Sequence, residues 1–181
     1  MKQFLDIVDP IHDFIRVYSI ELKVIDSPIF QRLRRIRQLS GAHLTYPSAQ
    51  HSRFEHSLGV MHIAGQASNA LKEKGFLNSD QIQEIRLAAL LHDVGHGPFS
   101  HLFEEVLQLK KKISHEDIGK KIIQESEIGD ILSKGGFDKK KITKLAFGYP
   151  KYRFVNEIIS RSEEHTSELQ SHSDLVCRLL L

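Results

Sequence analysis

The feature that most constrains this chain is a charged dipeptide at the end of an apolar helix. The predicted helix carries Ile82, Ile85 and Ala89 on one face and is almost entirely apolar near its end, so it is expected to be buried on most sides. His92 and Asp93 follow at that end. Because an unpaired carboxylate is costly to bury, the chain must fold so that a cation reaches Asp93.

A divalent metal ion would supply that cation. Imidazole and carboxylate ligands together suit a borderline or hard divalent metal, with coordination positions left for water and phosphate oxygens. The ligand types do not distinguish iron, manganese, zinc, nickel or magnesium. Of the 11 histidines, eight lie between His43 and His115. This clustering favours a site, and a chance accumulation of surface histidines is the alternative.

A second helix is needed to bring further ligands. Ser52 is a predicted N-cap for a long amphipathic helix over residues 53–74, which Gly75 ends. Its first turns contain the peptide RFEHSLG, which offers His56 beside Arg53. Taken alone, His56 could equally be a core or surface histidine with a backbone partner. Its pairing with the His-Asp dipeptide favours a metal site.

Helices are also expected over most of the remaining chain. Residues 4–18 alternate apolar and polar side chains and predict a β-hairpin. A short helix is expected over 19–25, and a basic helix over 28–38, with Pro28 at its first position. Three further helices are expected over residues 98–108, 115–125 and 139–147. The predicted fold class is therefore all-α, a helical bundle with a short N-terminal β-hairpin.

Composition limits the class of protein and its partners. The chain has 181 residues, of which 40% are hydrophobic and 27% charged, as in an ordinary globular domain. Its net charge of +2 is too small to bind nucleic acid or a membrane by charge alone. No run of 18 apolar residues occurs, and the N-terminal peptide MKQFLDIVDP lacks the apolar core of a signal peptide. We expect a cytoplasmic protein without a membrane partner.

The last 21 residues do not match the rest of the chain. From Arg161, the peptide RSEEHTSELQS resembles one reading frame of a widely used DNA-sequencing adapter, and SHSDLVCRLLL often follows such translations. We expect residues 161–181 to be a non-native tail that packs poorly, and residues 1–160 to be the N-terminal part of a longer enzyme. The alternative is a genuine amphipathic end. The tail holds the single cysteine, Cys177, so thiol chemistry is excluded for the rest.

The peptides RFEHSLG and LLHDVGHGPFSH, taken together, resemble the HD-domain phosphohydrolases. Within these, the chain is similar to the deoxynucleoside triphosphate triphosphohydrolases of the SAM-and-HD-domain branch, because DPIHDFI, SPIFQRLRRIRQL and SRFEHSLGV follow that branch in order and spacing. The resemblance covers residues 1 to about 160. It implies an all-α HD domain with one metal ion or a close pair. The implied reaction is hydrolysis of a dNTP to a deoxynucleoside and tripolyphosphate.

The resemblance implies three metal ligands in this chain. They are His56, His92 and Asp93. A fourth ligand, an Asp, is expected in a motif after residue 160 that this sequence does not contain. The fragment is therefore expected to be impaired.

The catalytic residues implied by the resemblance lie around the Gly-rich turn after Asp93. His101, with Glu104 one turn later, is similar to the pair that protonates the leaving group. His96 and His115 are similar to histidines that contact phosphate. His115 could instead be only a first-turn helix residue. For Gly95, a simple helix stop and a close backbone approach are equally good interpretations.

The resemblance also implies binding residues and partners. The substrate-binding residues are Arg53, Gln38 and Leu39, the last two beside the sugar. A guanine-nucleotide activator is implied at Asp26, Gln31 and Arg34, where an ordinary solvated basic helix is the alternative. The partners are thus a dNTP substrate, this activator and further copies of the full-length chain in a homo-oligomer.

Two other functions stay open at this point. The first is another nucleotide phosphodiesterase or pyrophosphohydrolase of the HD superfamily. The second is a non-catalytic HD module that binds nucleotides or nucleic acid, which the missing fourth ligand favours. The lysine runs at 110–112 and 139–141 would suit nucleic acid, although such runs are more often solvated faces.

Overall fold

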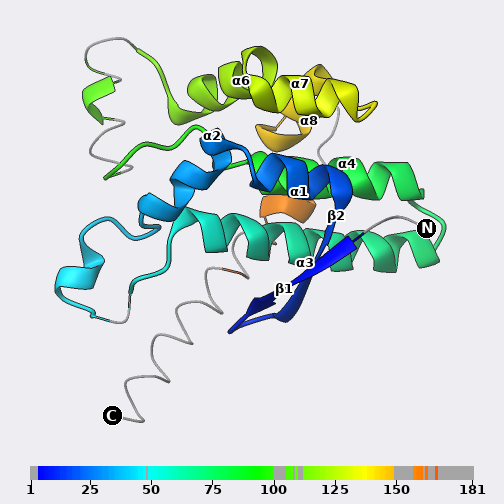
Figure 1. Cartoon of the computed structure of the whole chain (residues 1–181), viewed down its shortest axis with the longest axis horizontal. Helices are drawn as coiled ribbons and strands as arrows, with labels where there is room; N and C mark the ends of the chain where they lie inside the picture. The colour runs from blue at the N-terminus through cyan, green and yellow to red at the C-terminus, as the bar shows by residue number, and fades with distance from the viewer. Residues whose placement is uncertain are drawn as a thin grey trace.

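The computed structural model describes residues 4–47, 49–99, 105–107, 109, 112–148, 157–160, 162 and 166. Within this part of the chain, helices surround one core, and a two-stranded antiparallel sheet lies at its edge. Figure 1 shows α3 and α4 running beside each other, with the hairpin on one side and the group α6, α7 and α8 on the other. The predicted all-α class with an N-terminal hairpin is confirmed.

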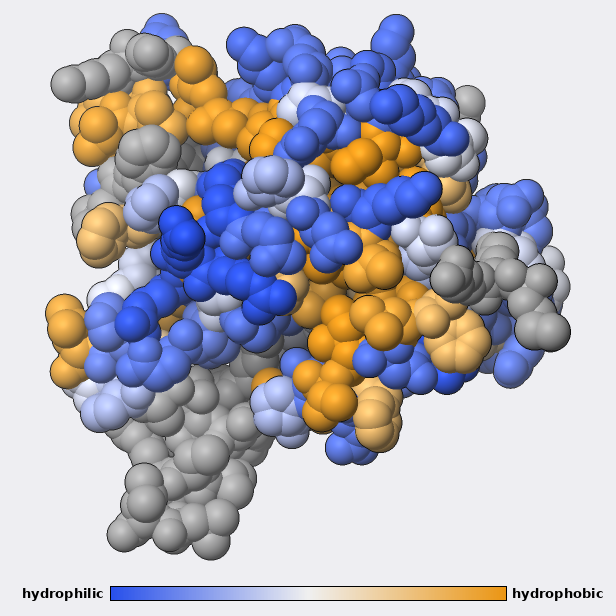
Figure 2. All heavy atoms as spheres, viewed as in Figure 1, coloured by the Kyte–Doolittle hydropathy of each residue, from blue (hydrophilic) through white to orange (hydrophobic). Residues whose placement is uncertain are grey.

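The hairpin consists of β1 (Phe4–Asp9) and β2 (Asp13–Tyr18). Its turn is held by the Asp9 carboxylate, whose Oδ1 accepts hydrogen bonds from two backbone N–H groups. Strand alternation turns Ile15 and Val17 into the core, where both are fully buried. The opposite face is exposed, and Figure 2 shows apolar atoms gathered over the hairpin, which carries exposed Phe4 and Phe14.

The basic helix predicted over 28–38 is shorter than expected. After α1 (Ser19–Ile25), the segment forms α2 (Pro28–Gln31), tightens into the 3-10 helix η1 (Arg32–Arg35) and becomes extended at Ile36. The cause is tertiary, because the Gln38 N–H donates to the His51 carbonyl and the Arg53 N–H to the Ile36 carbonyl. The predicted loop after it contains a further 3-10 turn, η2 (Ala42–Leu44).

The two central helices form where the sequence predicts them. Helix α3 (Arg53–Glu73) begins after Ser52, which forms a capping box with Glu55, and α4 (Ser79–Leu91) begins after Asn78. The two helices pack along each other and bury Leu58, Met61, Ala88 and Leu91, among other residues. None of the described helices, α3 included, is both long enough and apolar enough to cross a membrane.

The remaining helices match the predictions in part. Helices α6 (His115–Glu125) and α8 (Lys139–Ala146) lie where they were predicted, over 115–125 and 139–147. Helix α7 (Glu127–Lys134) was missed, although Ser126 is its N-cap and Ile128 and Leu132 form a buried face. The helix predicted from Pro98 does not begin there, because Phe99 has a left-handed φ of 58°, which a right-handed helix excludes. Residues 105–107 are helical.

Two residues of the predicted foreign tail are described. Ser162 and Thr166 are helical and buried, and the Ser162 hydroxyl donates to the Ile158 carbonyl. The expectation of poor packing is therefore wrong at these two positions. The other residues of 161–181 lie outside the described part, and the adapter origin of the tail stays a prediction.

A buried ion pair connects the hairpin, α1 and α4. Glu21 is fully buried, and its carboxylate lies 2.7 Å from Arg86 Nε and 2.9 Å from Arg86 Nη2. Gln83 Nε2 and the Tyr18 N–H donate to the same carboxylate at 2.6 and 2.9 Å. The second hydrogen bond of Arg86 Nη2 reaches the Arg16 carbonyl in β2. Both carboxylate oxygens of Glu21 therefore accept hydrogen bonds, and each charge of the pair compensates the other.

Replacing one partner should strongly destabilise the fold. Glu21→Ala leaves the Arg86 guanidinium buried without an anion, and we expect the free energy of unfolding to fall by about 3–5 kcal/mol. Urea unfolding followed by circular dichroism measures this. Asp6→Ala, which removes the exposed Asp6–Arg16 ion pair, is the control and should leave the midpoint nearly unchanged. Equal midpoints for Glu21→Ala and the wild type would contradict the structural role of Glu21.

Candidate metal centre

Three buried side chains converge where α3 and α4 meet. His56 comes from the first turn of α3, His92 is the C-cap of α4, and Asp93 follows it. One possible ligand atom from each lies within 4.8 Å of the others, and all three residues are buried. The rings of His56 and His92 are 5.5 Å apart between centroids. The sequence-predicted ligand set is thus brought together from two helices.

The orientation of His92 fits a metal ligand. Its Nδ1 lies 2.6 Å from the Ala89 carbonyl oxygen, which can only accept, so Nδ1 carries the proton. Its Nε2 is buried, has no hydrogen-bond partner among the described residues and lies 3.6 Å from Asp93 Oδ1. A backbone carbonyl that fixes the tautomer is typical of metal-binding histidines. A divalent cation between Nε2 and the carboxylate would satisfy both atoms, and the donor set therefore fits a divalent metal cofactor.

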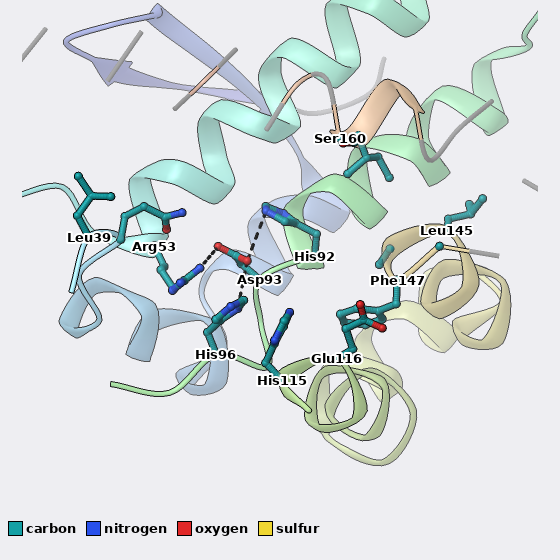
Figure 3. A pocket seen from close by; sticks show the side chains of 14 residues that line it. Leu39, Arg53, His92, Asp93, His96, His115, Glu116, Leu145, Phe147 and Ser160 are labelled. Carbon is teal, nitrogen blue, oxygen red and sulfur yellow. Dashed lines mark hydrogen bonds and ion pairs between the residues drawn. The ribbon is translucent and has the colours of Figure 1, made fainter. Parts of the chain in front are cut away.

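Asp93 is held as a carboxylate. Burial by itself raises the pKa of Asp93, and His92, His96 and Arg53 outweigh burial and keep this pKa well below its ordinary value. Arg53 Nη1 lies 2.5 Å from Oδ2, and His96 Nδ1 lies 3.1 Å from Oδ1. Figure 3 shows Arg53, His92 and His96 around this carboxylate. The expectation that a buried Asp93 needs cationic neighbours is met by Arg53 even before a metal is considered.

The turn after Asp93 lies directly against α6. A Cβ added at Gly95 would lie 2.0 Å from the His115 carbonyl oxygen and 2.5 Å from the Gly119 nitrogen. Both contacts are with backbone, which cannot move aside without shifting α6. Of the two interpretations that the sequence left open for Gly95, the structure gives the close backbone approach. This approach brings the rings of His96 and His115 into a stack, with centroids 4.0 Å apart.

A cavity of about 480 Å³ opens beside the cluster. Its lining includes five of the residues predicted to act on or bind substrate: Arg53, Gln38, Leu39, His96 and His115. The opposite wall contains Leu145 and Phe147 (Figure 3). This wall was not predicted, because apolar helix-end residues carry no chemical pattern that separates them from core residues. Glu116 was missed because an acidic residue in the first turn of a helix is common without any further role.

The other predicted residues lie elsewhere. Asp26 is the exposed C-cap of α1, and Gln31 Nε2 donates to the Ile25 carbonyl at 2.8 Å. Arg34 donates from Nε to Gln31 Oε1 at 2.8 Å and stacks on the Phe54 ring. None of the three lines the cavity beside the metal cluster. Their role at an activator site stays a prediction.

The catalytic pair predicted to act on the leaving group was His101 and Glu104. Both lie outside the described residues.

Comparison with known proteins identifies the family. The family described as HD domain matches residues 53–180, which is well over half of the chain, and the chain belongs to that family. Over 99 residues it is 46% identical to the deoxynucleoside triphosphate triphosphohydrolase SAMHD1 of Homo sapiens, a stretch that covers 53% of this chain and 16% of the relative. Over 158 residues it is 38% identical to an uncharacterised protein of Bacillus subtilis, covering 84% of this chain and 36% of that protein.

Solved structures share the fold. A hypothetical protein from Aquifex aeolicus matches with a TM-score of 0.72 and 38% identity, over 86% of this chain and 42% of that chain. A phosphohydrolase from Bacteroides thetaiotaomicron matches with a TM-score of 0.71 and 31% identity, over 87% of this chain and 38% of that chain. The chain thus spans less than half the length of each of these relatives.

Metal binding should depend on the carboxylate at the centre of the cluster. We expect the chain to bind one divalent metal ion or a close pair, and Asp93→Ala to weaken binding at least 100-fold because the anionic ligand is lost. Titration with Mn²⁺, followed by electron paramagnetic resonance of the free ion, measures this. His62→Ala removes a histidine of the same helix α3 that lies outside the cluster and should bind as the wild type does. Equal affinities for Asp93→Ala and wild type would refute the assignment.

Proposed function

We propose that this chain is the HD-domain part of a metal-dependent dNTP triphosphohydrolase. The observation that carries the proposal is the continuity between the His56, His92 and Asp93 cluster and a cavity lined by Arg53 and two stacked histidines. The relatives named as deoxynucleoside triphosphate triphosphohydrolases support the same reaction. The named phosphohydrolase among the similar structures supports the broader class.

The chemistry of the cavity suits a nucleoside triphosphate. A triphosphate needs neutralising charge and hydrogen-bond donors, and cleavage beside its α-phosphorus needs a water nucleophile and a proton for the leaving oxygen. A divalent metal held by His56, His92 and Asp93 would supply charge neutralisation and lower the pKa of bound water. The Arg53 guanidinium and the ring N–H groups of His96 and His115 would hold phosphate oxygens. In this proposal, His101 with Glu104 protonates the leaving group.

The two walls of the cavity suit the other parts of a nucleotide. Gln38 and Leu39 lie on one side, and we assign them to the sugar, where they would discriminate against a ribose 2′-hydroxyl. Leu145 and Phe147 form an apolar wall on the other side, where a base can pack. A cavity of about 480 Å³ is within the range expected for a small-molecule site of roughly 300–1,000 Å³.

The proposal includes residues from outside this chain. We propose that residues 1–160 are the N-terminal part of a longer enzyme, in which a further Asp completes the metal site, and that residues 161–181 are foreign to it. The activator site at Asp26, Gln31 and Arg34 and a homo-oligomeric full-length enzyme belong to the same proposal. A chain that lacks the fourth ligand would be impaired in turnover.

The product of hydrolysis tests the proposed reaction. We expect the enzyme that carries this HD domain and its native C-terminal continuation to release tripolyphosphate from at least one dNTP with Mn²⁺ present, as measured by ion-exchange chromatography. Gln38→Ala should reduce the preference for dNTP over NTP, and His101→Ala should slow turnover by roughly 100-fold or more.

The control in this assay is Asp93→Ala, which should release no product. Release of pyrophosphate or orthophosphate in place of tripolyphosphate would contradict the proposed reaction and assign the protein to another class of phosphohydrolase. If no nucleotide gives a metal-dependent product, the result would favour a non-catalytic binding module.

A further inference from the structure

A half-buried arginine lies behind the turn that follows Asp93. Arg32, the first residue of η1, donates from Nη1 to the His96 carbonyl at 2.7 Å and from Nη2 to the Val94 carbonyl. Among the described residues it has carbonyl partners and no carboxylate partner, and burial lowers its pKa. Partly burying a guanidinium so that it can bind two main-chain carbonyls costs desolvation free energy. An arginine without such a role would keep its guanidinium in solvent and avoid this cost.

The two carbonyls belong to the turn that orients His96. Gly95 between them packs on the backbone of α6, so the turn is held by η1 on one side and by α6 on the other. The His96 ring then lies 3.1 Å from Asp93 Oδ1 and stacks on His115. The His96 ring can hold this position only if its backbone is fixed. The hydrogen bonds from Arg32 to that backbone therefore help to determine where the ring lies.

We propose that Arg32 is a positioning residue, which fixes the 94–96 turn so that the His96 imidazole faces Asp93, His115 and the phosphate of a bound nucleotide. The orientation of His96 toward a nucleotide phosphate rests on the proposed function, whereas its orientation toward Asp93 and His115 does not. Arginine suits this role because its rigid fork can donate to two acceptors at once. Lysine keeps the charge and loses the fork, so Arg32→Lys separates geometry from electrostatics.

The matched control is Arg35→Lys. Arg35 lies in the same 3-10 helix and is exposed. We expect the ring ¹⁵N and ¹H resonances of His96 in the metal-free 181-residue chain to shift in Arg32→Lys and to stay in place in Arg35→Lys. The ring resonances of His62, which lies outside the turn, should stay in place in both. Unchanged His96 resonances in a folded Arg32→Lys variant would overturn the proposal.

A second measurement needs no variant. In the wild type, rotation about the Nε–Cζ bond of Arg32 should be slow enough to give separate Nη resonances, because both Nη groups are hydrogen-bonded, whereas exposed Arg35 should give averaged ones. Averaged Nη resonances for Arg32 would overturn the proposal, even if Arg32→Lys does not fold.

Kinetics tests the step that depends on the proposed function. In the enzyme with its native continuation, Arg32→Lys should lower kcat about tenfold, and the same change in a His96→Ala background should cause no further loss. A purely structural effect would instead lower kcat by the same factor in both backgrounds and reduce the melting temperature. Additive losses would therefore overturn the positioning role. Absence of wild-type turnover would count against the proposed function alone, since the resonance measurements decide the Arg32 contacts independently.

Discussion

The buried carboxylate of Asp93 is the constraint on which the site depends. It lies at the end of α4, where the helix is surrounded by core residues, and in that place a negative charge is tolerated only with close cationic partners. Arg53 supplies one from the first turn of α3, and a ring nitrogen of His96, Nδ1, lies 3.1 Å from the carboxylate on the other side. Each of these residues comes from a different segment, so the requirement of a single carboxylate fixes how α3, α4 and the following turn meet.

The same constraint explains why the site has a rigid frame. The turn after Asp93 is pressed against the backbone of α6 at Gly95, and the carbonyls on either side of that glycine accept from Arg32. The His92 ring is held by the Ala89 carbonyl of its own helix. The turn and the His92 ring are therefore oriented by main-chain contacts, and preorganisation of this kind is what metal binding and phosphate recognition require.

Much of this arrangement could be predicted from local sequence signals. Ser52 begins α3 as expected, and α4 forms where the apolar pattern predicted a helix. The pairing of His56 with the His-Asp dipeptide favoured a metal site, and the family resemblance implied the three ligands that the structure brings together. What could not be predicted depends on contacts between distant segments. The strand-like pairing at Ile36 that ends the basic helix early is one example, and the carbonyl contacts of Arg32 are another, because nothing in the sequence separates Arg32 from the neighbouring arginines.

We assign His56, His92 and Asp93 together to the binding of a divalent metal. Anomalous diffraction from crystals of the protein grown with Mn²⁺ tests it most directly. We expect an anomalous peak about 2.0–2.3 Å from one nitrogen of each histidine and from an oxygen of Asp93. An ordered Mn²⁺ bound only at other residues, with Asp93 still paired to Arg53 and no peak between the two imidazoles, would contradict it.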